Sequence, residues 1–127
     1  LGTVTQLPLF DTSALLAFIY EEPGSDNVEL HLSDGGMISA VNWSELGQKI
    51  LHHNLGWANI SQQLKAVGLI VQPVTEEDAE GAALLWEAGD GLSIADRLCL
   101  SMGQRLGVPI ITADKAWAKF PGVNVIR

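Results

Sequence analysis

Residues 91–117, GLSIADRLCLSMGQRLGVPIITADKAW, hold the pattern that decides the fold. Ser93 is a suitable cap for a helix that runs to Leu106, and apolar residues recur along one side of that stretch. Gly107 then ends the helix. The apolar run 108–112 that follows predicts a buried strand. A helix followed closely by a fully apolar strand is typical of α/β proteins with a parallel sheet.

Outward from this stretch, short apolar runs alternate with helical patterns along the whole chain. Strands are predicted at residues 7–10, 37–41, 69–74, 108–112 and 123–126. Helices are predicted at 12–20, from Ser25 to before Gly35, at 44–55, 58–67, from Thr75 to about Trp86, at 93–106 and 115–120. Pro73 marks the third strand as an edge or a strand end. We therefore expect a mainly parallel sheet of four to five strands covered by helices on both faces, a three-layer α/β/α fold.

The composition indicates one compact unit. The chain has 127 residues, 47% of them apolar, and no repeat or Pro/Gly-rich linker divides it, so residues 1–127 are expected to form a single domain. The lone Cys99 cannot form an internal disulfide. The early apolar stretch follows no basic segment, and no run approaches the roughly 20 apolar residues of a membrane span. We expect a protein of the cytoplasm with no membrane association.

The formal charge of −8, with only seven basic residues, is unfavourable for binding nucleic acid through the protein's overall field. Taken alone, this acidity indicates no more than a soluble surface. A polyanionic substrate would need local positive charge, and bound cations could supply it.

Three of four candidate acids lie where an α/β sheet places its ligands, and tertiary packing would have to bring the fourth, Asp96, to the same place. Asp11 directly follows the first predicted strand, and Asp114 comes two residues after the fourth. Glu45 opens the helix after the second strand, and Asp96 lies in the first turn of the 93–106 helix. Ligands of open α/β sheets bind at the carboxyl ends of the strands. Clustered carboxylate oxygens there would suit Mg²⁺ or Mn²⁺ better than zinc.

Each of these acids also has a purely structural explanation. Asp11 and Asp114 could be ordinary helix caps, and Asp96 is placed for a capping box. Glu45 could pair with Lys49 one turn later. For each acid considered alone, the sequence does not exclude a purely structural role.

The basic, histidine and tryptophan residues near the acids give less specific indications of function. The basic residues close to them are Lys49, Arg97 and Lys115. They could touch a nucleic-acid backbone, although Arg97 and Lys115 are expected to pair with neighbouring acids. His52 and His53 match no zinc motif and are expected as a surface or half-buried pair at a helix end. Three tryptophans, Trp43, Trp86 and Trp117, lie beside helical apolar faces, so core or interface packing is expected for them.

The segments that carry the acids resemble the PIN-domain family, most closely the VapC-type ribonuclease toxins of toxin–antitoxin pairs. The matching segments are residues 9–17 (LFDTSALLA), 39–45 (SAVNWSE), 91–100 (GLSIADRLCL) and 107–117 (GVPIITADKAW). Their order and spacing cover nearly the whole chain.

The resemblance implies a PIN fold, metal-dependent hydrolysis of RNA phosphodiester bonds, an antitoxin that covers the active groove, and a homodimer. It assigns Asp11, Glu45, Asp96 and Asp114 as catalytic acids that ligate Mg²⁺ or Mn²⁺. Ser13 and Thr112 are implied as supporting polar groups.

Two other functions fit part of the pattern. An aspartyl-phosphate enzyme or receiver domain also places Asp after a strand, but the phosphatase class needs a second Asp two positions later, where this chain has Ser13. A PIN-like domain used only to bind a partner is the other alternative, and the intact acids count against it.

Overall fold

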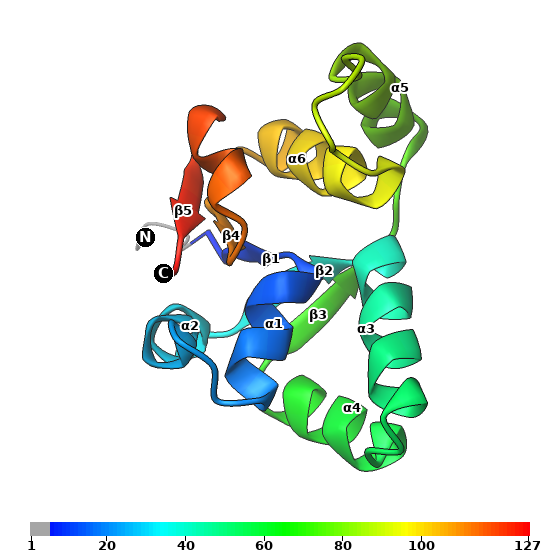
Figure 1. The fold of residues 1–127 in the computed structure, drawn as a ribbon. Helices are drawn as coiled ribbons and strands as arrows, with labels where there is room; N and C mark the ends of the chain where they lie inside the picture. The colour runs from blue at the N-terminus through cyan, green and yellow to red at the C-terminus, as the bar shows by residue number, and fades with distance from the viewer. Residues whose placement is uncertain (1–5) are drawn as a thin grey trace, which may run out of the picture.

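The computed structural model describes residues 6–127 and contains one five-stranded sheet. The strands are β1 (Leu9–Phe10), β2 (Gly36–Ser39), β3 (Leu69–Gln72), β4 (Ile110–Thr112) and β5 (Val123–Val125). They lie in the order β3-β2-β1-β4-β5, and every pair is parallel (Figure 1). The predicted parallel sheet is therefore confirmed. The edge position predicted for the third strand, from Pro73, is also confirmed.

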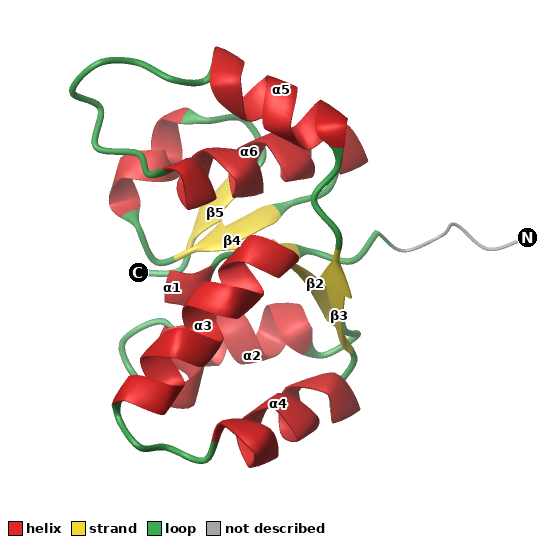
Figure 2. Cartoon of the chain, turned by 90° about the vertical axis from the view of Figure 1, so that its right-hand side faces the viewer, coloured by secondary structure: helices red, strands yellow, loops and turns green. Residues whose placement is uncertain are grey.

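Helices cover both faces of the sheet (Figure 2). They are α1 (Thr12–Ile19), α2 (Ser25–Leu32), α3 (Ala40–His52), α4 (Trp57–Ala66), α5 (Glu76–Leu84), α6 (Ile94–Leu106) and the 3₁₀ helix η1 (Lys115–Lys119). The first four lie on one side, while α5, α6 and η1 lie on the other. This is the predicted three-layer α/β/α arrangement. No helix within residues 6–127 is both long and apolar enough to cross a bilayer.

Each face of the sheet has its own apolar core because side chains alternate along each strand. Phe10, Ile38 and Ile111 point into the core beneath α1–α4, whereas their neighbours Leu9, Met37 and Ile110 join the core beneath α6 and η1. On this second side α6 approaches β4 through Gly103. A Cβ at that position would collide with Ile110. This close contact fixes how near the last turns of α6 lie to the start of β4.

Some boundaries differ from the predicted ones for local reasons. The second strand ends at Ser39 and α3 begins at Ala40, four residues earlier than predicted, because the Ser39 hydroxyl caps α3 by accepting from the Asn42 N–H. Ser25 was predicted to cap the second helix. Instead it is the first helical residue, and Gly24, with φ of 95°, occupies the cap position.

Helix α5 is held against α6 by a buried ion pair. Arg105 Nε donates to Asp78 Oδ1 at 2.6 Å, and the Asp78 side chain is fully buried. Burial raises the pKa of Asp78, but hydrogen bonds from Arg105 and from the Thr75 N–H outweigh that effect, so the pKa lies below its usual range. The pair therefore stabilises the fold only while the carboxyl is ionised.

We expect Arg105→Met to lower the free energy of unfolding by about 3 kcal/mol at pH 7, because it leaves a buried carboxylate without its partner. The matched control is Arg127→Met, which removes a pair with Glu22 at 3.5 Å between exposed side chains and should cost less than about 1 kcal/mol. Urea unfolding measures both. The Arg105 deficit should shrink as the pH falls below 3.8, the ordinary pKa of the carboxyl. Equal losses in the two variants would contradict this assignment.

Candidate active site

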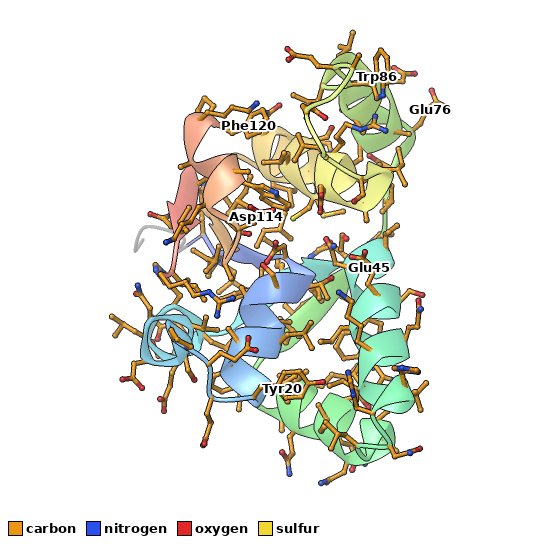
Figure 3. The ribbon with its side chains drawn as sticks, in the orientation of Figure 1. Tyr20, Glu45, Glu76, Trp86, Asp114 and Phe120 are labelled. Atoms are coloured by element: carbon orange, nitrogen blue, oxygen red, sulfur yellow. The ribbon has the colours of Figure 1, made fainter. Side chains whose placement is uncertain are left out.

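The four candidate acids come from four elements that meet at one edge of the sheet. Asp11 caps α1 directly after β1, and Asp114 caps η1 after β4. Glu45 lies in the second turn of α3, which follows β2, and Asp96 in the first turn of α6. Figure 3 shows Glu45 and Asp114 on either side of the start of α1. Because β2, β1 and β4 are neighbours in the sheet, their carboxyl ends bring these residues into one region.

Asp11 is buried and held by side chains from two strand ends. Thr112 donates to its Oδ2 at 2.7 Å, the Ser13 hydroxyl lies 2.8 and 2.9 Å from the two carboxylate oxygens, and the Ala14 N–H donates to Oδ1 at 2.9 Å. The Ala113 N–H in turn donates to Ser13 Oγ at 2.9 Å. The carboxylate thus joins the first turn of α1 to the end of β4.

Glu45 is held by a second network. Its Oε1 accepts from the Thr12 hydroxyl at 2.8 Å and from Asn42 Nδ2 at 2.9 Å. Asn42 is buried and is itself oriented by Ser39, whose hydroxyl donates to Asn42 Oδ1 at 2.9 Å. Thr12 follows Asp11 in the chain, so the same turn of α1 contacts both acids.

Asp96 and Asp114 are held by backbone groups near the ends of their own helices. Asp96 Oδ2 accepts from the Ser93 N–H at 3.0 Å in a capping box, as predicted for a structural role. Asp114 Oδ1 accepts from the Ala116 N–H at 2.9 Å, and the Asp114 N–H donates to Thr112 Oγ1 at 3.0 Å. Each cap uses one carboxylate oxygen and leaves the other available. These acids can therefore cap a helix and bind a ligand at the same time.

The acids repel one another through space. Burial is the main cause that raises the pKa of Asp11 to about 6, against the lowering effect of its hydrogen bonds, and the charge of Asp96 raises it further. Burial also raises the pKa of Asp96, with added repulsion from Glu45 and Asp114. Among residues 6–127, however, no three Asp, Glu, His or Cys side chains converge closely enough to enclose a metal ion. The acids are near enough to interact electrostatically without forming a closed site.

The chemistry of this donor set suits a hard cation. All four candidates offer carboxylate oxygen, and among the described residues none of them forms an ion pair with Lys, Arg or His. A buried ionised carboxylate without a positive partner is unfavourable, and a divalent cation would remove that cost. The residues present therefore fit Mg²⁺ or Mn²⁺.

The structure also corrects several expectations about neighbouring residues. In the part of the chain that the structure describes, Glu45 forms no ion pair with Lys49, and Arg97 forms none with an acid. Arg97 instead donates to the Ala82 carbonyl at 2.8 Å and so ties α6 to α5. Trp117 is fully buried as expected. Trp86 lies beyond the end of α5 and is 61% exposed, so it does not pack in the core, and interface packing stays a prediction for it.

Thr12, Ser39 and Asn42 were missing from the sequence-based site. The spacing of Ser39 and Asn42 could have indicated them, because Ser39 caps a helix and Asn42 lies three positions later. That spacing can be recognised only once α3 is known to begin at Ala40.

We expect the metal-free protein to lose stability as the pH rises from about 4 to about 6, because folded Asp11 binds its proton more tightly than the unfolded chain does. Full ionisation would cost on the order of 3 kcal/mol. Asp11→Asn keeps a good capping residue and removes this charge, so the variant should lose that part of the slope. Thermal melts in EDTA across this pH range test it. A variant with the wild-type slope would show that another group carries the proton.

Comparisons with known proteins agree with this architecture. The sequence matches the model of the PIN domain over residues 9–123. Searching the curated proteins gave no match.

Solved structures are similar in fold at low sequence identity. A chain of a toxin–antitoxin complex from Klebsiella pneumoniae aligns with a TM-score of 0.79 at 20% identity, over 94% of this chain and 98% of that one. A chain of the DNA-bound VapBC complex from Salmonella typhimurium aligns with a TM-score of 0.69 at 13% identity, over 95% and 97%. The protein PAE2754 from Pyrobaculum aerophilum aligns with a TM-score of 0.63 at 23% identity, over 93% and 83%. By the extent of the family match, the chain belongs to the PIN domain family.

Proposed function

We propose that this protein is a metal-dependent endoribonuclease, the toxin of a toxin–antitoxin pair. The observation that carries the proposal is the cluster of carboxylates at the carboxyl edge of the sheet, where buried Asp11 forms no ion pair with a cationic side chain of residues 6–127. Membership of the PIN family, whose members are generally nucleases, supports the reaction class. It also argues against an aspartyl-phosphate enzyme.

Asp11, Glu45, Asp96 and Asp114 would together hold Mg²⁺ or Mn²⁺. When bound, the cation would supply positive charge beside the scissile phosphate and acidify the attacking water. The carboxylates themselves form no covalent bond with the RNA.

The polar side chains around the acids have a positioning role in this proposal. Ser13 and Thr112 fix the Asp11 carboxylate from two directions, and their hydrogen bonds favour its ionised form. Thr12 and Asn42 fix Glu45 in the same way. Both acids are therefore oriented before a ligand arrives, which reduces the ordering needed at the moment of binding.

We further propose an antitoxin partner and a homodimer. The support is the similarity in fold to chains from toxin–antitoxin complexes. On the surface, a hollow of about 630 Å³ between the end of α1 and the start of α2 combines Phe18 and Ile19 with four acids, namely Glu21, Glu22, Asp26 and Glu29. Smaller hollows continue it along Phe18 towards α4. An amphipathic, basic segment of a partner protein would match this combination of apolar and acidic groups.

The test is cleavage of a cellular RNA preparation by purified protein. We expect cleavage with Mg²⁺ or Mn²⁺, none in EDTA, and at least about a 100-fold loss in Asp96→Asn, because that change removes a metal-facing charge. The matched control is Asp90→Asn in the adjoining loop, where the side chain only accepts from the Leu92 N–H. It should cleave like the wild type.

Cleavage that resists EDTA, or full activity in Asp96→Asn, would refute the proposed mechanism. Absence of any cleavage by the folded wild type with either metal would favour a PIN domain that only binds a partner.

A further inference from the structure

The charge of this acidic protein is distributed very unevenly along the chain. Residues 46–75, which form most of α3, all of α4 and β3, contain none of the fifteen acidic residues. They include two of the seven basic residues, Lys49 and Lys65, so this segment carries a formal charge of +2 and the rest of the chain −10. A polyanion would meet least repulsion over this segment.

A hollow in the same region combines aromatic and hydrogen-bonding side chains. It has a volume of about 630 Å³ and lies between α3 and the start of α4, where Figure 2 shows the two helices converging at an angle. The half-buried rings of Trp43 and Trp57 lie 4.7 Å apart with their planes tilted by 53°. Gly47 permits this packing, since a Cβ there would come within 3.1 Å of the Trp57 ring. Exposed Ser44, Gln48 and His52 supply polar groups at the rim.

The two lysines lie beside this hollow and have no acidic partner. Lys65 Nζ lies 5.6 Å from the centre of the Trp43 ring. Lys49 follows Gln48 on α3 and is exposed. Neither lysine forms an ion pair within residues 6–127. Both ammonium groups are therefore available to an anionic ligand.

Part of the rim of the hollow lies close to the candidate active site along α3. Gln48, on the rim, and Lys49 follow Glu45 by one turn and so lie on the same surface of the helix as Glu45. His52 comes two turns after Glu45, about 10 Å along the axis. A strand of RNA with its scissile phosphate near Glu45 would therefore reach the hollow with its next few nucleotides.

We propose that this α3–α4 face, comprising Trp43, Ser44, Gln48, Lys49, His52, Trp57 and Lys65, binds single-stranded RNA next to the cleavage site. The inference rests on the proposed ribonuclease function. The aromatic rings offer a surface on which a base stacks, as in other single-strand binding sites. Ser44, Gln48 and His52 face the edge of that base, and the two lysines neutralise flanking phosphates. A second copy of this chain would fit less well, because three exposed residues of the rim, Ser44, Gln48 and His52, are polar and only one, Leu51, is a large apolar residue.

Binding of a fluorescently labelled single-stranded RNA, measured by anisotropy with Mg²⁺, tests the charge component. Asp96→Asn serves as the background so that the RNA stays intact. Adding Lys49→Gln and Lys65→Gln together should weaken binding at least about tenfold and flatten the dependence of log affinity on log salt by about 1.4, roughly 0.7 for each phosphate contact. The matched control is Lys119→Gln with Arg127→Gln, two basic residues that lie outside the α3–α4 face. A loss equal to that of the control pair would overturn the proposal.

A second double variant tests the base-binding component. Gln48→Ala with His52→Ala removes exposed polar groups, so the fold should survive, which circular dichroism checks. It should weaken binding several-fold with no change in the salt slope, because no charge contact is lost. Unchanged binding would overturn the assignment of the hollow to a base.

Two outcomes distinguish failure of the proposed function from failure of the α3–α4 proposal. If the wild type neither cuts nor binds RNA, the proposed function fails. If it cuts and binds RNA but both α3–α4 variants match it, only the α3–α4 proposal fails. Sedimentation of each variant completes the test: a dimer that dissociates in the Lys49/Lys65 or Gln48/His52 variant would show that this face is a contact between copies and would overturn RNA binding there.

Discussion

The site depends on one buried negative charge. Asp11 lies at the end of the central strand, 4% exposed, and its carboxylate would be expensive to bury without compensation. Hydrogen bonds from Thr112, Ser13 and the Ala14 N–H offset part of that cost, and they come from both sides of the β1–β4 pair. Burial outweighs these hydrogen bonds and keeps the pKa of Asp11 high, with a smaller contribution from the charge of Asp96. The fold thus supplies the geometry of the site but leaves its charge to be balanced by a cation.

Three of the candidate acids stabilise the start of a helix and also belong to the cluster at the edge of the sheet. Asp11 and Asp114 cap helical segments, and Asp96 completes a capping box with Ser93. Caps are stabilising wherever a helix starts, so such acids by themselves indicate little about function. Their significance comes from the parallel sheet, which directs three consecutive strand ends and the helices after them to one edge. Ordinary helix starts are brought together there as a group of like charges.

The sequence predicted the strands and helices well, but it predicted poorly which side chains orient the acids of the site. Apolar runs and helix signals located every strand and the edge position of β3, because burial on both faces of a parallel sheet requires continuous apolar strands. The start of α3 was misplaced because residues 40–43 are as compatible with a strand as with a helix, and the cap at Ser39 decides between them. That error hid Asn42 and its bond to Glu45. The exposure of Trp86 and the bond from Arg97 to Ala82 depend on tertiary packing that no local pattern encodes.

The hydrogen bond between Thr112 and Asp11 joins residues 101 positions apart. The central strand, near the amino end, needs β4 from near the carboxyl end before its acid is held. During synthesis on a ribosome, this pairing cannot form until the residues of β4 have emerged. A product that stops before residue 112 would contain three of the four acids and still lack the bond that orients the first. Emergence of β4 is thus a condition for assembly of the site.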